Sequence, residues 1–506
     1  MAYEIGTATN FKDLFDKMIA FLTTNATLVA AGQQWQVLRQ YSDNIAQFTT
    51  SFTATNTDAA RNPQHTFRYD ARSINYEAFN SGNAHYTMTV SAAGTSGNHL
   101  TFKLRTAKAV DRTWIRHVYL TSGYGPKSFT IEYSDDGVAW TQFANITDTG
   151  ATPTSGEERT FTGLNSAGAH LWYRIKVNNV FVTSPGYAGW ANWLLLNGTE
   201  PINHFGDEVI FKAKGNSGAD AIFMGIRSEY DSAAGWYDWM LNGYTGYDAS
   251  VQSWFKQPGA ITLTESLVQY ICPMMTYWDS SMPYWFVANG RSFRWSVKVS
   301  TSYMAGYMGW LLPYSTPSQY PYPLVVAGNL APTTSARATN WRYSLVSYNM
   351  GTPAGPGATS YAAAGAQTSN GSMYCRDPQG SWQNFANRPS YASVASESIQ
   401  TFTLTNTGLN DNNNTASNVR GVWPHCWYAN TIRDGISGAQ LLMPCVLVEG
   451  STTKQLPYGE LDGYYFTSGT NNAAENTAVV GGKNHVVFSG CYRTSQGEYF
   501  TLCLDT

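Results

Sequence analysis

Two pairs of carboxylates have the spacing that a glycosidase could use. Glu460 and Asp462 stand two residues apart in "PYGELDGYY", and Glu229 and Asp231 repeat this spacing. On a β-strand both members of a pair would project from one face, where one could act as an acid and the other as a base or nucleophile. The glycines around Glu460 and Asp462 favour a turn instead. We therefore expect neither pair to be catalytic.

The other chemistry-bearing residues form no catalytic pattern. The sequence has no Gly-x-Ser-x-Gly nucleophile motif, no phosphate-binding glycine loop and no dinucleotide-binding glycine signature. His425 and Cys426 are adjacent in "PHCW", whereas zinc ligands in a pair usually stand about two to four residues apart. The acidic turn at Asp135 and Asp136 could hold a structural Ca²⁺, but nothing in the sequence requires one. The sequence predicts a non-enzymatic protein with no catalytic residue, metal ion or other cofactor.

The cysteines indicate buried thiols rather than a disulfide framework. A chain of 506 residues can build its cores without disulfides, and no Cys-x-x-Cys pair is present. We expect reduced cysteines in a protein that folds in a cytoplasm. The six cysteines stand at positions 272, 375, 426, 445, 491 and 503.

The composition indicates a charge-poor, aromatic-rich protein. Charged residues make up 13% of the chain and aromatic residues 14%, against a usual charged share of about 25%. A net charge of -3 gives no broad basic field, so we expect no nucleic-acid partner. No stretch approaches the roughly 18 apolar residues of a membrane span, and no export signal is visible at the N-terminus. Viral structural proteins combine these features.

The first element is predicted to be an amphipathic helix. In "NFKDLFDKMIAFLTTN", from Asn10, apolar residues recur at intervals of three and four. Thr9 or Asn10 can cap the helix, and Asp13 lies in its first turn, where the helix dipole favours a carboxylate. The stripe either packs on its own domain, which is the commoner outcome, or docks a partner. The candidate docking residues are Phe11, Leu14, Phe15 and Met18.

β-structure dominates the rest of the sequence, with short alternating runs such as "HYTMTVSA" and "HLTFKLRTA" between turn residues. The stretch "SFTIEYSDDGVAWTQF" predicts a hairpin, with Phe129, Ile131 and Tyr133 on one face and a turn at 134–137. Trp140 then returns to the apolar layer. The predicted fold class is mainly β, a multi-domain architecture of β-sandwich or jelly-roll type with a short N-terminal amphipathic helix.

The hairpin and the later strand "LWYRIKV" resemble the discoidin, or factor 5/8 type C, family of galactose-binding-like β-sandwiches. The resemblance covers about residues 85–190. It implies a sandwich that binds sugars, lipid head groups or proteins through loops at one end. The residues that carry the resemblance would build the sandwich core and its turn. We therefore favour a structural use of this module over glycan binding.

The second half resembles a group of structural proteins from tailed bacteriophages, over about residues 200–506. The shared phrases are "IFMGIRSEYDSAAGWYDWMLNGYTGY", "PSQYPYPL" and a terminal unit made of "YGELDGYY", "AEN", "RTS" and "YFTLCLD". The resemblance implies a virion component of the neck, tail or baseplate that assembles as symmetric copies with other virion proteins and could anchor fibres. Such a protein is made in the host bacterial cytoplasm and then assembled into the virion. The alternative is a tail-fibre protein that recognises a host surface glycan, and a polysaccharide depolymerase is less favoured.

The segment "PSQYPYPL" is a candidate subunit contact. Pro321 and Pro323 lack the N–H donors of a central strand, which favours an extended arm with Tyr320 and Tyr322 exposed along it. An arm of this kind loses little entropy when it binds a neighbouring subunit. The equally weighted alternative is a rigid loop that crosses its own domain.

Composition shifts suggest the domain boundaries, in a chain long enough for about three domains. Ownership of residues 34–84 stays open, and the sandwich could be an insertion with "QQWQVLRQY" and "WANWLLLNG" paired at its base. We expect an N-terminal helix and arm at 1–33, a discoidin-like sandwich region at 34–198, a β-rich phage structural domain at 199–348, a linker or long loop at 349–372 and a C-terminal β-rich domain at 373–506.

Overall fold

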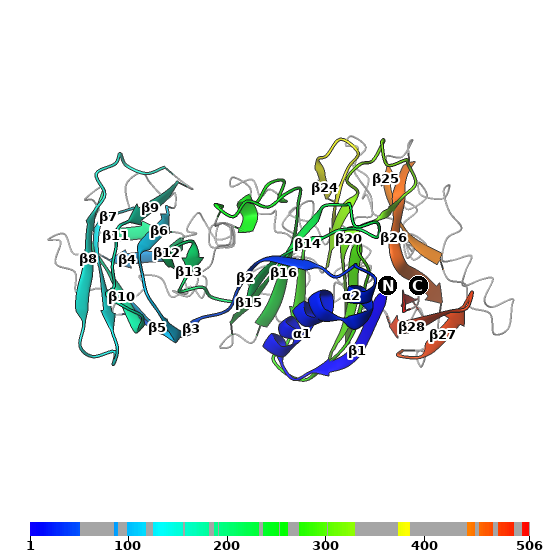
Figure 1. The fold of residues 1–506 in the computed structure, drawn as a ribbon, viewed down its shortest axis with the longest axis horizontal. Helices are drawn as coiled ribbons and strands as arrows, with labels where there is room; N and C mark the ends of the chain where they lie inside the picture. The colour runs from blue at the N-terminus through cyan, green and yellow to red at the C-terminus, as the bar shows by residue number, and fades with distance from the viewer. Residues whose placement is uncertain are drawn as a thin grey trace, which may run out of the picture.

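The computed structural model shows a mainly β protein with a short N-terminal helix, which confirms the predicted fold class (Figure 1). Three groups of sheets follow one another along the long axis of the molecule. The structure describes residues 1–50, 86–89, 99–117, 125–154, 157–181, 187–190, 192–231, 236–251, 254–261, 273–300, 302–328, 373–384, 443–450, 455–468, 474–489 and 498–504.

The N-terminal segment is part of a central sandwich. It comprises β1 (Ala2–Ala8), α1 (Phe11–Thr24), α2 (Ala26–Ala30) and β2 (Gln36–Tyr41). The Asn10 side chain caps α1 by accepting a hydrogen bond of 2.9 Å from the backbone N–H of Asp13. The whole apolar stripe of α1 is buried against the sandwich core, so the proposed docking helix is wrong. The buried stripe consists of Phe11, Leu14, Phe15, Met18, Phe21 and Leu22.

Two antiparallel sheets enclose this core. Sheet A has the order β1, β18 (Met282–Ala288), β19 (Ser292–Val299), β20 (Ser302–Trp310), β22 (Leu324–Ala327), β23 (Met373–Arg376) and β24 (Trp382–Asn384). Sheet B has the order β17 (Met274–Tyr277), β16 (Trp236–Tyr244), β15 (Ile222–Asp231), β14 (Glu208–Ala213) and β2. A short 3₁₀ turn, Trp254–Lys256, follows β16.

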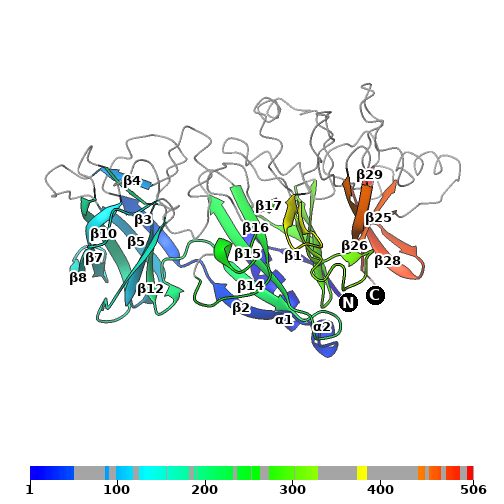
Figure 2. The ribbon, with the colours of Figure 1, turned by 90° about the horizontal axis from the view of Figure 1, so that it is seen from above.

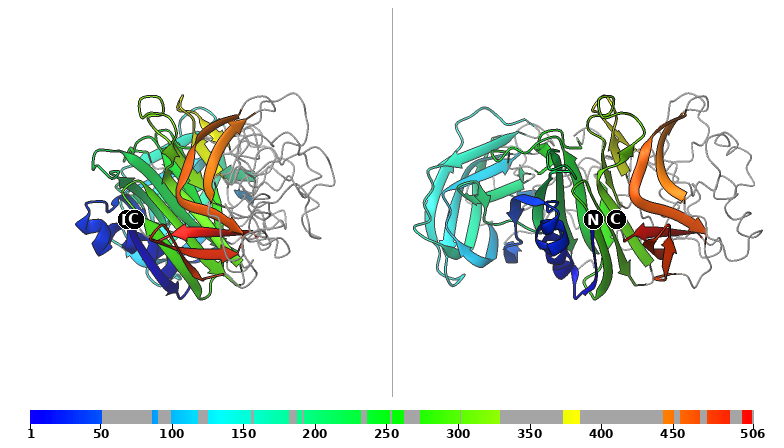
Figure 3. Two further views of the ribbon diagram at one scale, coloured as in Figure 1. Left: turned by 90° about the vertical axis from the view of Figure 1, so that its right-hand side faces the viewer. Right: turned by 45° about the vertical axis from the view of Figure 1, so that its right-hand side comes forward.

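A third sheet covers the other face of sheet A, so that three layers stack (Figures 2 and 3). Along β18, Tyr284 and Phe286 enter the core shared with sheet B, whereas Trp285 and Val287 enter the core shared with the third sheet. Burial on both faces explains the unbroken apolar run "YWFVA". The third sheet, sheet F, contains β21 (Leu312–Pro313), β25 (Met443–Gly450), β26 (Gln455–Ser468), β27 (Thr477–Val480), β28 (Lys483–Ser489) and β29 (Glu498–Cys503).

A separate β-sandwich, here called the inserted sandwich, lies beyond sheet B. Its two main sheets share a core in which Phe129 meets Trp193 edge-to-face at 4.7 Å between ring centroids. Sheet C contains β3 (Ile45–Thr50), β5 (His99–Lys108), β10 (His170–Val180), β7 (Pro126–Ser134) and β8 (Thr141–Thr147). Sheet E contains β13 (Glu200–Pro201), β12 (Asn192–Asn197), β6 (Arg112–Arg116) and β9 (Glu158–Thr162), and β4 (Tyr86–Thr89) pairs with β11 (Tyr187–Trp190).

The inserted sandwich interrupts the central sandwich between β2 and β14. These two strands pair with each other in sheet B, while β3 and β13 already belong to the insert. The predicted pairing of "QQWQVLRQY" with "WANWLLLNG" is wrong, because β12 pairs with β6 and β13. Residues 36–41 therefore belong to the scaffold rather than to the region 34–198. Likewise β23 and β24 extend sheet A rather than the C-terminal domain, and residues 349–372 lie outside the described part.

The "PSQYPYPL" segment packs within its own chain, so the exposed subunit-contact arm is wrong. Tyr320 is 1% exposed and packs on Tyr458 at 5.7 Å between ring centroids. The Tyr322 hydroxyl donates a 2.7 Å hydrogen bond to the backbone oxygen of Tyr244. Of the four residues proposed as the contact, Tyr320 and Pro323 are buried, Tyr322 is partly buried and Pro321 is exposed. The segment is therefore a rigid loop that crosses its own domain, which was the alternative to a subunit-contact arm.

Two of the six cysteines have described side chains. Cys375 and Cys503 are both buried and neither forms a disulfide among the described residues, as expected. Burial raises the pKa of the Cys375 thiol to about 12, which keeps it protonated and unreactive. The side chains of the other four cysteines lie outside the described part of the chain.

Candidate functional site

The inserted sandwich has two ends with different surroundings. At one, the junction end, β3 begins and β13 ends, and both strands lead into the central sandwich. At the other end, β6, β8 and β10 finish while β5, β7, β9 and β12 begin, as their antiparallel registers require. It is called the free end because neither chain crossing lies there, although Glu158 at the start of β9 pairs with Lys256 of the central sandwich at 2.6 Å. Loops at a strand end can present side chains to a ligand without disturbing the sheet.

A buried histidine lies at the free end, directly after β6. His117 is 1% exposed, and neither of its ring nitrogens has a hydrogen-bond partner among the described residues. Burial, reinforced by the nearby Arg159 charge, lowers the pKa of His117 to about 4. The imidazole is therefore neutral at neutral pH, with one donor and one acceptor nitrogen, neither of them paired within the described part of the chain. A buried polar ring without partners among the described residues is costly, which makes His117 a candidate ligand contact. Because the ring is 1% exposed, a ligand can reach it only if the surrounding loops move.

The chain leaves room for this ring by placing a glycine beside it. A β-carbon at Gly125 would lie 2.7 Å from Nδ1 of His117, so a larger residue would push the ring aside. The backbone N–H of His117 donates a 2.8 Å hydrogen bond to the Glu157 carbonyl, which ties the end of β6 to the start of β9. The histidine is thus held in place by its backbone, while its ring has no hydrogen-bond partner in the part of the chain that the structure describes.

Arg159 organises the loops around the histidine. Its guanidinium contacts the Asp148 carboxylate, donates to Glu157 at 2.7 Å, and donates to the carbonyl of Ala151 at 2.6 Å. The backbone N–H of Thr154 and the Arg159 guanidinium hold the pKa of Glu157 below its ordinary value. Residues from β8, β9 and the loop between them are thereby fixed together. Arg159 is a positioning residue, because its hydrogen bonds go to the protein itself.

An aromatic ring with cations over it completes the described part of the free end. The Phe181 ring has the Arg159 guanidinium 5.3 Å and the Lys127 ammonium 5.9 Å from its centroid. Within the described residues, the free end thus combines an imidazole without a hydrogen-bond partner, an aromatic ring and positive charge. Hydroxyl-rich ligands are recognised by such a mixture of hydrogen-bonding groups and apolar surface.

The outer face of sheet C carries a second aromatic and charged cluster, but its groups satisfy one another. Glu132 accepts hydrogen bonds of 2.6 Å from Arg174 and 2.7 Å from Lys176. Burial acts to raise the pKa of Glu132, but these two cations outweigh it and hold the pKa below its ordinary value. Arg174 also lies 4.2 Å from the Trp140 ring centroid. The prediction of Trp140 as a core residue is therefore wrong, because Trp140 lies half-buried on this outer face.

The Asp-Asp-Gly turn of the hairpin is structural, as the sequence predicted. Asp136 accepts hydrogen bonds from the backbone N–H groups of Val138 and Ala139 at 2.8 and 2.9 Å. Gly137 has a φ of +77°, and a β-carbon there would meet the Trp172 ring at 2.9 Å. Within the described residues, no three His, Cys, Asp or Glu side chains cluster in a way that could hold a metal ion.

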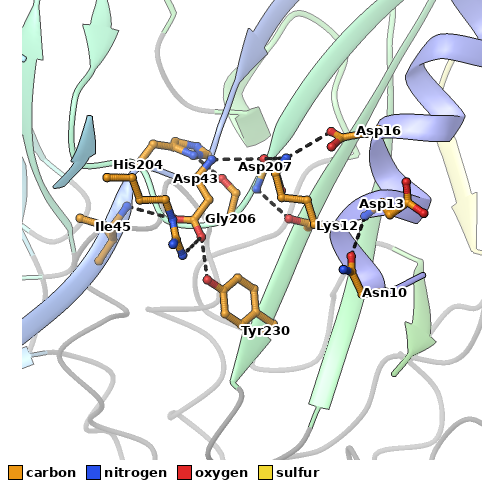
Figure 4. A network of polar contacts seen from close by, with 12 residues as sticks. Asn10, Lys12, Asp13, Asp16, Asp43, Ile45, His204, Gly206, Asp207 and Tyr230 are labelled. Carbon is orange, nitrogen blue, oxygen red and sulfur yellow. Dashed lines mark hydrogen bonds and ion pairs between the residues drawn. The ribbon is translucent and has the colours of Figure 1, made fainter. Parts of the chain in front are cut away.

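Polar contacts hold the inserted sandwich to the scaffold at the junction end (Figure 4). Asp43 accepts a 2.6 Å hydrogen bond from the Tyr230 hydroxyl and a 3.1 Å bond from the N–H of Ile45. Asp207 accepts a hydrogen bond of 3.2 Å from Lys12 on α1 and another of 3.2 Å from the N–H of Asp43. Both chain crossings between the two sandwiches are therefore bonded to each other and to α1.

A buried ion cluster lies directly behind this junction. Glu208, which is fully buried at the start of β14, contacts Arg39 of β2 at 2.6 Å and Arg227 of β15 at 3.6 Å. His204 Nε2 lies 3.6 Å from the same carboxylate. Despite burial, these groups, Arg39 above all, lower the pKa of Glu208 to about 2. The cluster locks together the strands from which the inserted sandwich departs and to which it returns.

The carboxylate pair on β26 lies far from the inserted sandwich, in sheet F. Asp462 binds Arg294 at 3.0 Å and Asn289 at 2.9 Å, and Arg294 holds the pKa of Asp462 below its ordinary value against the effect of burial. Burial raises the pKa of Glu460, which lies 3.5 Å from the Tyr314 hydroxyl. The predicted turn is wrong, because both residues lie within a strand. The side chains of Glu229 and Asp231 are outside the described part.

The sequence pattern could have revealed some of these groups. In "LWYRIKV" the buried residues Tyr173 and Ile175 alternate with Trp172, Arg174 and Lys176, so the outward cluster is visible as an amphipathic strand. No such signal marks His117, because its burial and its missing partners arise only when β6, β8 and β9 come together.

The comparisons with known proteins bear on the inserted sandwich. Residues 78–167 match the model of the NedA-like, galactose-binding domain of the F5/8 type C family. No curated protein matches the chain. Within the described residues, no helix has the length and apolar character that a bilayer crossing needs.

Solved structures similar to part of the chain are carbohydrate-binding or F5/8 type C modules. The family 32 module of AlyQ, in complex with 4,5-unsaturated mannuronic acid, shares 16% identity and covers 31% of this chain and 99% of its own (TM-score 0.22). The F5/8 type C domain of a Bacteroides fragilis protein shares 14%, with 32% and 95% covered (TM-score 0.22). The family 32 module of C. perfringens NanJ, in complex with galactose, shares 15%, with 31% and 98% covered (TM-score 0.21).

The family match identifies the inserted sandwich as a discoidin-like domain of the F5/8 type C, galactose-binding-like class. This confirms the resemblance seen in the sequence, and the insert is called the discoidin-like domain from here on. None of the matches points to a phage virion protein.

Proposed function

We propose that this chain is a non-enzymatic protein that recognises a glycan through the free end of its discoidin-like domain. The match of residues 78–167 to a galactose-binding domain model is the observation that carries the proposal. Glycan recognition, which was the alternative in the sequence analysis, is therefore our first proposal. The central three-layer sandwich then serves as the rigid mount of the domain.

The chemistry of the free end suits a sugar hydroxyl. A neutral imidazole offers one donor and one acceptor, and a hydroxyl group can pair with both kinds of group. His117 has both nitrogens unpartnered among the described residues, and its low pKa keeps it neutral over most of the pH range. Arg159 and Gly125 support it, the first by fixing the surrounding loops and the second by leaving space for the ring.

Binding of the full chain to a panel of immobilised glycans tests this proposal. We expect saturable binding to a subset of the glycans, with galactose-terminated chains as the first candidates because of the family model. His117→Gln should weaken binding to the best glycan about tenfold, since one to two hydrogen bonds are lost at about 1 kcal/mol each. Absence of binding to every glycan, or unchanged binding by the His117→Gln chain, would contradict the proposal.

The place of this protein in a tailed-phage virion is a separate proposal. It is supported by the resemblance of "IFMGIRSEYDSAAGWYDWMLNGYTGY", "PSQYPYPL" and the terminal unit that begins at "YGELDGYY" to phage structural proteins. A sugar-recognising domain on a rigid mount fits a receptor-binding tail-fibre protein better than a neck or baseplate component. In this setting the chain would fold in the bacterial cytoplasm and then join the particle.

Immunogold electron microscopy on purified particles tests the virion proposal. Label at distal fibre tips would support the receptor-binding function, and label at the neck or baseplate would favour assembly instead. If disrupted particles also carry no label, the virion proposal falls while the glycan proposal stands or falls on its own binding data.

A further inference from the structure

Strand β1 forms one edge of sheet A and is open on its outer side. It pairs with β18 over its whole length, Ala2 to Ala8, without any shift in register. Among the described residues no other strand pairs with it. An open edge exposes a row of backbone donors and acceptors that can bind another strand.

The open strand carries two exposed apolar side chains on the same face. Tyr3 and Ile5 are each 51% exposed, whereas Ala2 and Ala8 at the ends of the strand are buried. The opposite face is tightly held, because the Tyr284 hydroxyl donates a 2.6 Å hydrogen bond to Glu4. At Gly6 a β-carbon would lie 2.5 Å from the same hydroxyl, so glycine is needed there. The strand is therefore a fixed part of the sheet with one apolar face in solvent.

Several other described sheet edges show protection that β1 lacks. At the far edge of sheet A, β24 has only three residues, and in sheet F the edge strand β27 has four and ends at a glycine pair. In sheet C the edge strand β8 pairs with β7 through a bulge, and in sheet B the edge strand β2 also carries an irregularity. Short length and bulges are common ways to block edge pairing. With seven residues, no bulge, no proline and no basic residue, β1 is open to pairing.

We propose that β1 pairs antiparallel with β1 of a second copy of this chain, so that two copies of sheet A join across a two-fold axis. A two-fold contact requires one surface to be complementary to itself. With the axis at Ile5, Tyr3 faces Thr7 and Glu4 faces Gly6 of the other copy, and the two Ile5 side chains meet. The only charged residue of the strand is then opposite glycine, so no like charges face each other.

This register uses all seven residues of the strand. An axis at Glu4 would place the two Glu4 carboxylates opposite each other and leave part of the strand unpaired. In the proposed contact Tyr3 and Ile5 gain cross-strand neighbours, which reduces their exposed apolar surface. The proposal concerns the scaffold and is independent of glycan binding at the discoidin-like domain.

Sedimentation velocity on the full chain tests the contact. We expect a species of twice the chain mass at micromolar concentration. Ile5→Lys should convert it to the monomer, whereas Val138→Lys, at an apolar residue that is 82% exposed on the hairpin turn, should leave the dimer intact. A monomeric wild-type chain, or an Ile5→Lys chain that stays dimeric, would overturn the proposal.

A cysteine at the axis tests the register without a disruptive side chain. Directly opposite residues in an antiparallel pair have Cα atoms about 4.5–5.5 Å apart, within the range of about 4.4–6.8 Å that a disulfide accepts. Ile5→Cys should therefore form a disulfide-linked dimer in non-reducing electrophoresis, beyond any background of the parent chain. Tyr3→Cys, which faces Thr7, should not. If Tyr3→Cys crosslinks and Ile5→Cys does not, the proposed register is wrong.

Discussion

At the junction end of the discoidin-like domain, His170 has an oxygen atom 2.8 Å from each ring nitrogen, supplied by Asp135 and by the backbone of Ser166. At the free end, His117 is buried and has no partner for either nitrogen among the described residues. Both rings belong to one small domain, so stability alone does not explain the difference. Buried polar groups that maintain a structure are usually hydrogen-bonded, so a buried histidine without a partner among the described residues needs an explanation, and ligand binding is the one proposed above.

The junction end contains further polar groups that are paired within the protein. Asp43, Asp207 and Glu208 each contact groups from the other chain crossing or from neighbouring strands. These contacts fix the orientation of the discoidin-like domain on the central sandwich. We therefore assign the positioning role to the junction end and the binding role to the free end. Four experiments test this difference between the two ends.

The largest expected effect comes from the buried ion cluster. Glu208→Gln leaves the Arg39 guanidinium buried beside a neutral side chain, with Arg227 close by. Breaking a buried ion pair from one side costs about 3–5 kcal/mol, so the central sandwich should unfold at clearly lower denaturant concentration. Glu158→Gln, at a partly exposed pair with Lys256, is the matched control and should change stability by less than about 1 kcal/mol.

The same carboxylate predicts how stability depends on acid. The pKa of Glu208 falls from an ordinary value near 4.5 to about 2 in the folded chain. A depressed folded pKa gives stability that is present above about pH 4.5 and is lost as the pH falls towards 2, by about 3 kcal/mol in total. Denaturant unfolding at pH 6, 4 and 3 should show this loss, and the loss should be smaller in the Glu208→Gln chain. An equal loss in both chains would assign the acid sensitivity to other groups.

The free histidine predicts a different dependence on pH, in binding rather than in stability. Because the folded pKa of His117 is about 4, the ring stays neutral down to that pH. Glycan affinity should therefore hold from pH 7 to about pH 5 and fall only near pH 4, whereas a histidine with an ordinary pKa would change near 6.5. The His117→Gln chain should lack this step. A midpoint near 6.5 in the wild-type chain would show that another histidine controls binding.

The smallest effect is expected at the satisfied histidine. His170→Gln can replace only part of the contacts to Asp135 and Ser166, so it should lower the unfolding free energy of the domain by about 1 kcal/mol. Glycan affinity should not change, because the junction end does not contact the ligand in this account. Thermal unfolding and a binding isotherm on the same sample check both statements.

Local patterns in the sequence predicted much of the fold. The stripe from Phe11 to Leu22 is a helix, and the alternation around Phe129 and Ile131 is a hairpin strand, because both depend on spacing within a few residues. Partners distant in the chain were not predictable in this way. The pairing of β2 with β14 spans the whole inserted domain, and it shows that the N-terminal segment belongs to the scaffold.

The errors concern residues whose surroundings come from distant strands. Tyr320 was expected in solvent, but Tyr458 and the strand of Cys375 bury it. Trp140 was expected in the core, but it lies on the outer face of sheet C, where its ring contacts Arg174. His117 carried no sequence signal, since an unpartnered buried nitrogen is a property of the assembled loops. The candidate site was therefore the least predictable part of the molecule.

The decisive test of a glycan site at the free end is titration calorimetry with the best glycan. The measurement compares wild-type, His117→Gln and His170→Gln chains at pH 7. The account predicts about tenfold weaker binding for His117→Gln and unchanged binding for His170→Gln, with both variants folded. The opposite result, in which His170→Gln loses affinity and His117→Gln keeps it, would place the glycan site at the junction end and contradict the assignment made here.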